Sequence, residues 1–168
     1  MKQVLVLLFI TVVALFSGCG GSPESKYEHN GFHFTKPAGW EVNDEEFEDG
    51  VGSLFVEKEG FMASGLVSII WYQNEVPLEL LVETFMVAIG EDEGFTDFSA
   101  TQTKPIVYGQ YEGLGQSFSF KSEGFDYTGN CVGFSCGTFT VLVSYQGADE
   151  DSAENSVGFD ILEASIHC

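Results

Sequence analysis

The chain alternates between two hydrophobic periods, and their order restricts the fold more than any other feature of the sequence. Apolar residues recur at the strand period, or form short continuous runs, in segments 31–35, 40–42, 53–59, 65–72, 95–103, 115–121, 125–134 and 138–146. The period changes to three and four residues at 78–89, and again in a segment that begins near Asp149. Strands, a helix, strands and a helix in this order predict an α+β domain with an antiparallel β-sheet flanked by helices.

The predicted helices have recognisable ends. Pro77 lies near the first turn of the segment 78–89, where its missing N–H costs no hydrogen bond, and Gly90 follows as a stop signal. Acidic residues at 149–151 open the final helix, where carboxylates stabilise the positive end of the helix dipole. The segment 65–72 is almost continuously apolar, which predicts a central strand covered on both faces.

The composition argues against two classes of partner. The chain has 168 residues, enough for one domain, and its 16 Phe and 44% hydrophobic residues are too many for a disordered chain. Its 26 acidic residues stand against six Lys and no Arg, which gives a formal charge of −20. Because phosphate groups are bound by clustered cations, we expect no nucleic-acid partner and no surface that docks on anionic lipid head groups.

The N-terminal segment has the composition of an export signal. Lys2 precedes an apolar run at 4–16 that is too short to span a bilayer comfortably, and two small residues then lead to Cys19. This arrangement resembles the bacterial lipoprotein signal, which implies cleavage of residues 1–18 and attachment of acyl chains, palmitate among them, to Cys19. An ordinary secretory signal and a buried N-terminal strand are the alternatives.

The residues after this cysteine favour a particular location. Residues 19–29 begin with a small and polar stretch, which predicts a flexible tether that holds the acidic body off the membrane. In lipoproteins of double-membraned bacteria, which this signal resembles, the absence of Asp after the cysteine favours the outer membrane, and residue 20 here is Gly. We therefore expect a lipid-anchored protein of the cell envelope, in the outer membrane if the host has one.

The predicted domain, residues 30–168, resembles a known family. Two spaced patterns of core residues carry the resemblance: Phe34-x-x-Pro37-x-Gly39-Trp40 near its start and Phe159-x-Ile161-Leu162-x-x-Ser165-Ile166 at its end. Together with a helix after the fourth strand, they are similar to PsbP-like proteins, which include the periplasmic or lipid-anchored DcrB-type proteins. The resemblance implies a PsbP-like α/β/α sandwich and non-catalytic accessory, assembly or binding roles without a cofactor. The partner stays open, either an envelope protein or a small ligand.

Three patterns with chemical meaning have simpler structural explanations. Residues 133–137 match G-x-S-x-G, which would make Ser135 the nucleophile of a serine hydrolase, but strand-like residues follow it and favour a hairpin turn. The acidic stretch 44–49 is a candidate for calcium, but it lacks the alternating ligand order and fits a solvated loop. His29 and His33 have a metal-ligand spacing for a helix but lie at the start of a predicted strand. We therefore expect no enzyme and no metal site, with a hydrolase and a calcium-dependent binding protein as the alternatives.

Three cysteines remain if Cys19 is lipidated, and an oxidising compartment allows them to pair. Cys131 and Cys136 are an odd number of residues apart, so on one straight strand they face opposite sides and pair only if the strand breaks near Gly133. The final helix should run back along the last strand and bring Cys168 close to Cys136. We therefore predict the disulfide Cys136–Cys168, with Cys131 as the alternative to Cys136.

Exposed aromatic residues are the expected contact surface of such a module, because aromatic side chains supply much of the binding energy at interfaces. The candidates in the predicted loops and strand edges are Phe47, Phe61, Tyr108 and Tyr111.

Overall fold

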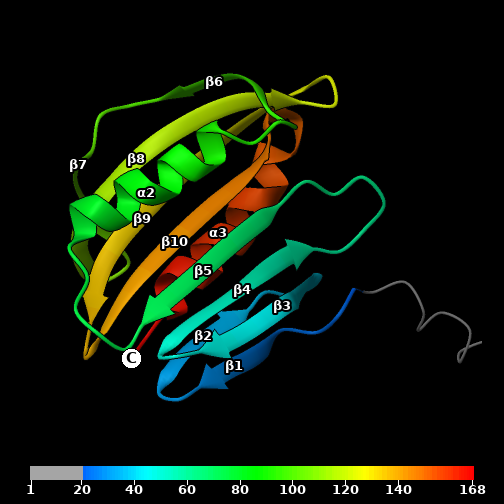
Figure 1. The fold of residues 1–168 in the computed structure, drawn as a ribbon. Coiled ribbons are helices and arrows are strands. Elements are labelled where there is room, and N and C mark those ends of the chain that lie inside the picture. Colours follow the sequence, from blue (N-terminus) through cyan, green and yellow to red (C-terminus); the bar gives the residue numbers. More distant parts are fainter. Residues whose placement is uncertain (1–20) are drawn as a thin grey trace, which may run out of the picture.

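The computed structural model describes residues 21–168, which form two antiparallel sheets and two α-helices (Figure 1). The strands of the large sheet are β3 (Trp40–Glu48), β4 (Val51–Lys58), β5 (Leu66–Tyr72), β6 (Thr96–Ala100), β7 (Lys104–Tyr108), β8 (Tyr111–Ser122), β9 (Phe125–Cys136) and β10 (Phe139–Ala148). Their spatial order is β3-β4-β5-β10-β9-β8-β6, and β7 also pairs with β8. The small sheet consists of β1 (Ser25–His29) and β2 (Phe32–Lys36).

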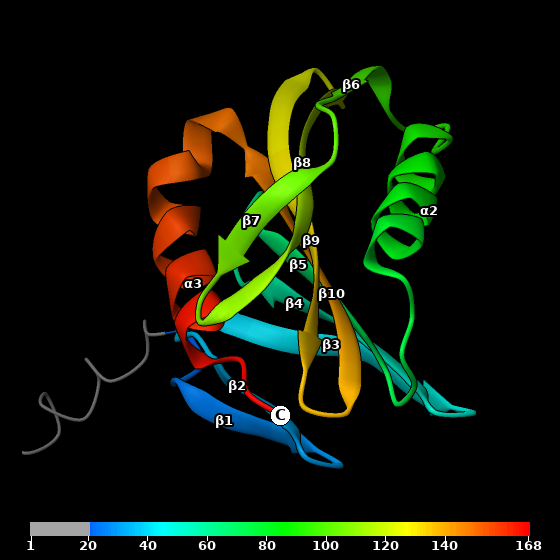
Figure 2. The ribbon, with the colours of Figure 1, turned by 90° about the vertical axis from the view of Figure 1, so that its left-hand side faces the viewer.

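The helices lie on opposite faces of the large sheet, as Figure 2 shows. Helix α2 (Leu78–Gly90) packs over β8, β9 and β10. Helix α3 (Ser152–Ser165), preceded by the short 3₁₀ turn η1 (Asp149–Asp151), packs on the other face beside the β1–β2 pair. Neither helix of residues 21–168 is long and apolar enough to cross a bilayer. The predicted α+β class, an antiparallel sheet with two helices, is confirmed.

Strand β10 is the centre of the core because it lies between β5 and β9 and has a helix over each face. Its alternate residues Val141 and Val143 are fully buried in the cluster under α3, while Leu142 is fully buried in the cluster under α2. The alternation of side chains along a strand therefore explains why nearly the whole of this segment is apolar.

Strand β5 is central, as predicted, but it is not covered equally on its two faces. Val67, Ile69 and Trp71 are buried on the α3 face, whereas Ile70 and Tyr72 are only half-buried on the other face. The reason is the position of α2, which lies over β8–β10 and leaves the β3–β5 half of that face open. The expectation of full coverage was wrong on this point.

Two glycines make room for the two tryptophans of the core. A Cβ atom on Gly52 would lie 2.1 Å from Cε2 of Trp71, and one on Gly158 would lie 2.4 Å from Cζ2 of Trp40. Since both distances are shorter than any normal contact, any larger residue at either position would displace an indole ring. The tryptophan of the Pro-x-Gly-Trp pattern is thus packed under α3, in the structural role that the resemblance implies.

Three segment boundaries differ from the sequence predictions. Ser25–His29, assigned to the tether, forms β1, because Tyr27 pairs with Phe34 across the small sheet and stacks on its ring with centroids 4.7 Å apart. The acidic residues 44–48 extend β3 instead of forming a loop, with a register shift between Asn43 and Glu46. The segment 95–103 ends early at Ala100, and a separate strand, β7, follows.

Candidate functional site

The structure places Ser135 in a β-hairpin and not at the strand-to-helix turn of a nucleophile elbow. Its side chain is exposed on β9, opposite Thr140 of β10, and a turn at Gly137 leads directly into that strand. A nucleophile elbow requires a strand that turns into a helix, because the helix N-terminus stabilises the oxyanion. The hairpin predicted for this segment is present, and the geometry gives the hydrolase alternative no support.

The candidate metal ligands are also separated. Within residues 21–168 no group of three or more His, Cys, Asp or Glu side chains is arranged to hold a metal ion. His29 and His33 lie on different strands, β1 and β2, and not on one strand as expected. His29 Nδ1 lies 3.0 Å from Oε1 of Glu45, and the ring of His33 lies 5.4 Å from that of His167. The acidic residues of segment 44–48 lie on the extended strand β3, where successive side chains alternate between the two faces of the sheet. They therefore do not converge on one ion, and the geometry does not favour the calcium alternative.

The cysteines occupy both faces of the sheet. Cys136 and Cys168 form a disulfide with an S–S distance of 2.03 Å and a Cα–Cα distance of 5.6 Å. Strand β9 runs unbroken from Phe125 to Cys136, so Cys131 lies on the opposite face, packed under α2, and forms no disulfide within residues 21–168. Burial raises the pKa of the Cys131 thiol to about 12. Cys19, the predicted lipid attachment residue, lies outside the described residues.

The four aromatic candidates divide into exposed and packed residues. Phe61 is 98% exposed and Phe47 is 37% exposed. Tyr108 is buried and stacks on Phe134, and Tyr111 is half-buried against the same ring. The expectation was wrong for Tyr108, because β7 pairs with the edge of β8 and turns this side chain into the core beneath α3.

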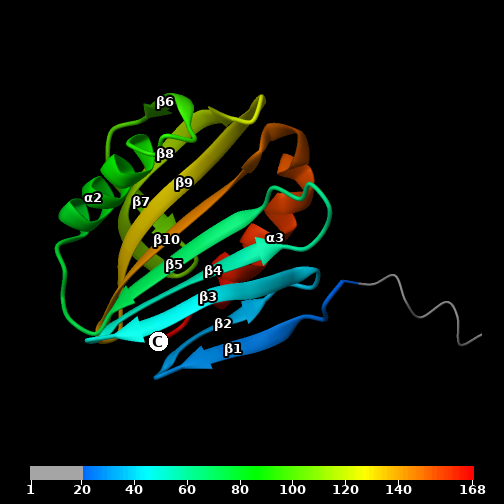
Figure 3. The same ribbon diagram turned by 45° about the vertical axis from the view of Figure 1, so that its right-hand side comes forward.

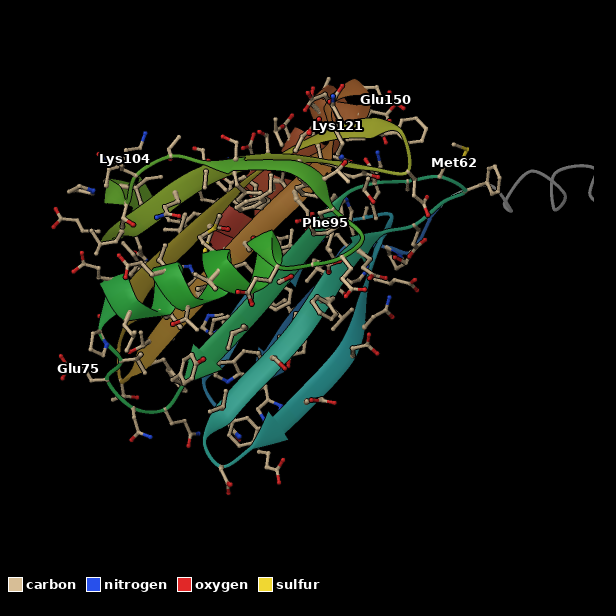
Figure 4. All side chains as sticks on the ribbon, turned by 45° about the horizontal axis from the view of Figure 1, so that its top comes forward. Met62, Glu75, Phe95, Lys104, Lys121 and Glu150 are labelled. Atoms are coloured by element: carbon tan, nitrogen blue, oxygen red, sulfur yellow. A yellow bond between two sulfur atoms is a disulfide. The ribbon has the colours of Figure 1, made fainter. Side chains whose placement is uncertain are left out.

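A cavity of about 390 Å³ lies at the end of the sheet where Phe61 is exposed. The loop between β4 and β5, the β8–β9 hairpin and η1 meet there, and we call this cavity the acidic pocket. Figure 4 labels Met62 and Glu150 at this end of the molecule and Glu75 at the opposite end. The residues that line the acidic pocket are Phe61, Met62, Ala63, Ser64, Glu123, Phe125, Tyr127, Ala148, Glu150 and Asp151.

Hydrogen bonds from distant segments hold the walls of the acidic pocket in place. The hydroxyl of Ser64 donates to Oδ2 of Asp151 at 2.7 Å, and the Ala148 N–H donates to the same hydroxyl oxygen at 2.9 Å. Nδ2 of Asn155, a fully buried side chain, lies 3.3 Å from that oxygen. The base of the β4–β5 loop is therefore fastened to η1 and α3.

The charge of the acidic pocket has one sign. Burial raises the pKa of the Tyr127 hydroxyl, and three nearby carboxylates raise it further: those of Glu123, Asp151 and Glu150. Among the described residues no lysine lines the pocket. The nearby Lys121 is already paired, with its Nζ 3.2 Å from Asp97 Oδ2. Aromatic faces with carboxylates around them attract ammonium cations, so the pocket has the chemistry to hold one.

A second cavity of about 490 Å³ lies between the β1–β2 pair and α3. It is larger than the acidic pocket, but its charges balance, because Lys26 and Glu28 line it together with His33 and His167. Volume alone therefore favours this second cavity, whereas a uniform field that selects one kind of ligand is present only in the first of these two.

The comparison with known proteins establishes the fold. No family model and no curated protein sequence matches the chain. Cyanobacterial PsbP from Synechocystis superposes with a TM-score of 0.59 at 13% identity, over 90% of this chain and 95% of that one. A protein from Bacteroides thetaiotaomicron superposes with a TM-score of 0.54 at 13% identity, over 88% of this chain but only 48% of that one. LpqN of Mycobacterium tuberculosis, described as involved in cell envelope biogenesis, has a TM-score of 0.48 at 8% identity, over 86% and 90% of the two chains. The chain therefore has a PsbP-like fold, as its sequence patterns suggested.

Sequence reasoning identified Phe61 but missed the acidic residues of the pocket. Glu123 belongs to the turn between β8 and β9, whereas Glu150 and Asp151 belong to η1, so the pocket joins two segments that are far apart in the chain. Residues 149–151 were correctly interpreted as the start of the final helical segment. That interpretation gave no sign that Glu150 and Asp151 also line the pocket.

Proposed function

We propose that this protein is a lipid-anchored, non-enzymatic module of the cell envelope that binds a ligand carrying an ammonium group in the acidic pocket. The anchor is the acylated Cys19, after removal of residues 1–18, and the location is the outer membrane if the host has one. The ammonium group is carried by a small ligand or by a lysine-bearing protein, the two partner classes that the sequence left open.

One observation carries the binding proposal, namely the uniform negative charge around an aromatic wall. The Tyr127 ring stacks on Phe120 with centroids 5.0 Å apart, which fixes it in the sheet. The carboxylates of Glu123, Glu150 and Asp151 surround it, and a cation placed there would gain both electrostatic and cation–π attraction. Such a site binds and orients a ligand.

Two further observations support a role without catalysis. Ser135, the residue of the hydrolase-like motif, lies in mid-hairpin with Thr140 opposite. Cys131 is the free cysteine of the described residues, but its side chain is buried. Burial raises the pKa of its thiol and keeps it in the protonated, unreactive form.

Binding is tested by titrating the protein with tetramethylammonium chloride, with sodium chloride at the same concentration as the control for ionic strength. We expect saturable NMR shifts of the Tyr127 ring and of the Glu150 amide. The variant Glu123→Gln/Glu150→Gln should weaken binding at least fivefold, since about 1 kcal/mol of attraction is lost when carboxylates lose their charge. The matched control Glu75→Gln/Glu112→Gln removes two exposed charges elsewhere and should bind normally. Equal effects of both double variants would refute a specific site.

Anchoring is tested separately by intact mass spectrometry of the protein purified from a bacterium that processes lipoproteins. We expect a chain that begins at Cys19 and carries fatty acids, and a Cys19→Ser variant without them. A wild-type protein that retains residues 1–18 and carries no fatty acid would refute the anchor.

A further inference from the structure

The first described residues are fastened to the domain and do not form a free tether. The Ser22 N–H donates to Oε2 of Glu59 at 2.9 Å, and the Gly39 N–H donates to the Ser22 carbonyl at 2.8 Å. The Ser22 hydroxyl donates to the Trp40 carbonyl at 2.7 Å and accepts a hydrogen bond from Lys36 Nζ at 2.7 Å. Four separate groups of the domain therefore hold this residue.

This attachment limits the distance between the domain and an acylated Cys19. Three Cα–Cα steps separate Ser22 from Cys19, and each spans at most about 3.8 Å, so the two Cα atoms lie at most about 11 Å apart. A domain anchored at Cys19 therefore rests on the membrane with the end that contains Ser22. The expectation of a tether that holds the body off the membrane was wrong for residues 22–29, which are bonded to the domain or form β1.

The loop between β4 and β5 lies at this same end. It follows directly after Glu59, the residue that binds the Ser22 N–H, and Figure 3 shows it beside the first described residues. Its tip carries Phe61, 98% exposed, and Met62, 68% exposed. Two adjacent large apolar side chains with this exposure are unfavourable in water and favourable at a bilayer interface.

The charges of this end select the kind of bilayer. Glu59, Glu123 and Glu150 lie around the loop, and they would be repelled by anionic head groups. Three lysines of this end are engaged within the domain: Lys36 with Ser22, Lys58 with Glu154 at 2.8 Å, and Lys121 with Asp97. An electrically neutral, zwitterionic surface fits this end, and its head groups carry ammonium groups at the level of the acidic pocket.

We propose that the loop 60–63 is a second membrane contact, in which Phe61 and Met62 insert into a zwitterionic bilayer while the acyl chains on Cys19 hold the domain there. The proposal rests on the anchoring proposed above. It gives the domain one orientation on the membrane, with the acidic pocket facing the head groups and the Cys136–Cys168 disulfide at the opposite end.

The test places one new indole at the tip of the loop and measures its depth. The acylated protein is reconstituted into phosphatidylcholine vesicles as the variant Phe61→Trp or as the matched control Phe47→Trp. Phe47 lies near the far end of β3, about 23 Å along the strand from Trp40, whose carbonyl accepts the hydrogen bond of the Ser22 hydroxyl. The native Trp40 and Trp71 are buried and contribute the same background to both. We expect lipids with brominated acyl chains to quench the emission of Phe61→Trp at least twofold more strongly than that of Phe47→Trp. Equal quenching in an acylated protein would overturn the loop contact and leave the anchor intact.

Two further arms separate the remaining possibilities. If mass spectrometry finds no fatty acid, the proposed anchor fails, and Cys19 is then coupled to a maleimide-bearing phospholipid. With this chemical anchor, preferential quenching of Phe61→Trp supports the loop contact and equal quenching refutes it. Replacing part of the phosphatidylcholine by phosphatidylglycerol should reduce the quenching, and unchanged or stronger quenching would refute the preference for a neutral surface.

Discussion

Removal of the disulfide by Cys168→Ser tests how the C-terminus is held. The Cys136–Cys168 bond joins residues separated by 32 positions in sequence, and the chain-entropy relation for such a loop gives about 3.7 kcal/mol of stabilisation at 25 °C. Most of this acts on the unfolded state, because the folded C-terminus has other attachments. The N–H and carbonyl of His167 each form a 2.9 Å hydrogen bond with His33, and Ile166 is buried. We therefore expect the variant to keep its fold and to lose about 3–4 kcal/mol of unfolding free energy.

The assay is urea unfolding followed by the fluorescence of Trp40 and Trp71. With a slope of about 2 kcal/mol per molar urea, the midpoint of Cys168→Ser should lie about 1.5–2 M below that of the oxidised wild type. Reductant should lower the urea midpoint of the wild type by the same amount and leave the midpoint of Cys168→Ser unchanged. The control Cys131→Ala removes a buried thiol on the other face, and its loss of stability should not depend on Cys168.

Two results would refute this reasoning. A midpoint for Cys168→Ser within about 0.3 M of the oxidised wild type would mean that the loop is not closed by this bond. A variant that still loses stability in reductant would mean that Cys136 pairs with Cys131, which requires a break in β9.

The other predictions concern three single positions. Gly52→Ala should lower the unfolding free energy by about 3 kcal/mol in urea, because its Cβ would overlap the Trp71 ring; a loss below about 0.5 kcal/mol would contradict the packing. The Cys131 thiol, with its pKa raised from 9.0 to about 12, should resist a disulfide reagent at pH 8 until the protein unfolds. The folded state favours the protonated thiol, so the contribution of Cys131 to the unfolding free energy is fully present below about pH 9 and is lost as the pH rises toward 12. The variant Cys131→Ala should lack this part of the decline in stability. Ser135→Ala should leave any hydrolysis of p-nitrophenyl acetate unchanged, and activity lost with this hydroxyl would support the hydrolase alternative.

The secondary structure was largely readable from the sequence because its signals are local. Pro77 and Gly90 bracket a helix that the structure places at Leu78–Gly90, and the alternation after Gly137 became the central strand β10. The core pattern around Trp40 pointed to the PsbP-like fold for the same reason, since these residues build the interior. Side chains of one helix or strand that face the core recur at the period of that element, and this period can be seen in the sequence.

Strand β1 is an element that local sequence signals did not predict. Ser25–His29 contains one aromatic residue, Tyr27, and its propensity is that of a linker. It became a strand because the Tyr27 ring stacks on Phe34 of β2. In the same way, the half-open face of β5 depends on the position of α2, which the sequence of β5 does not encode.

By itself, the sequence determined the class of fold and most of its elements, and it predicted the Cys136–Cys168 disulfide and an export signal that ends at Cys19. Only the tertiary structure decided that Ser22 is bonded to the domain, that Phe61 stands beside it, and that Glu123 and Glu150 converge around Tyr127. The physical reason is the range of the interactions. Periodicity is set by neighbouring residues, whereas a pocket is made by loops that meet only after the sheet has assembled.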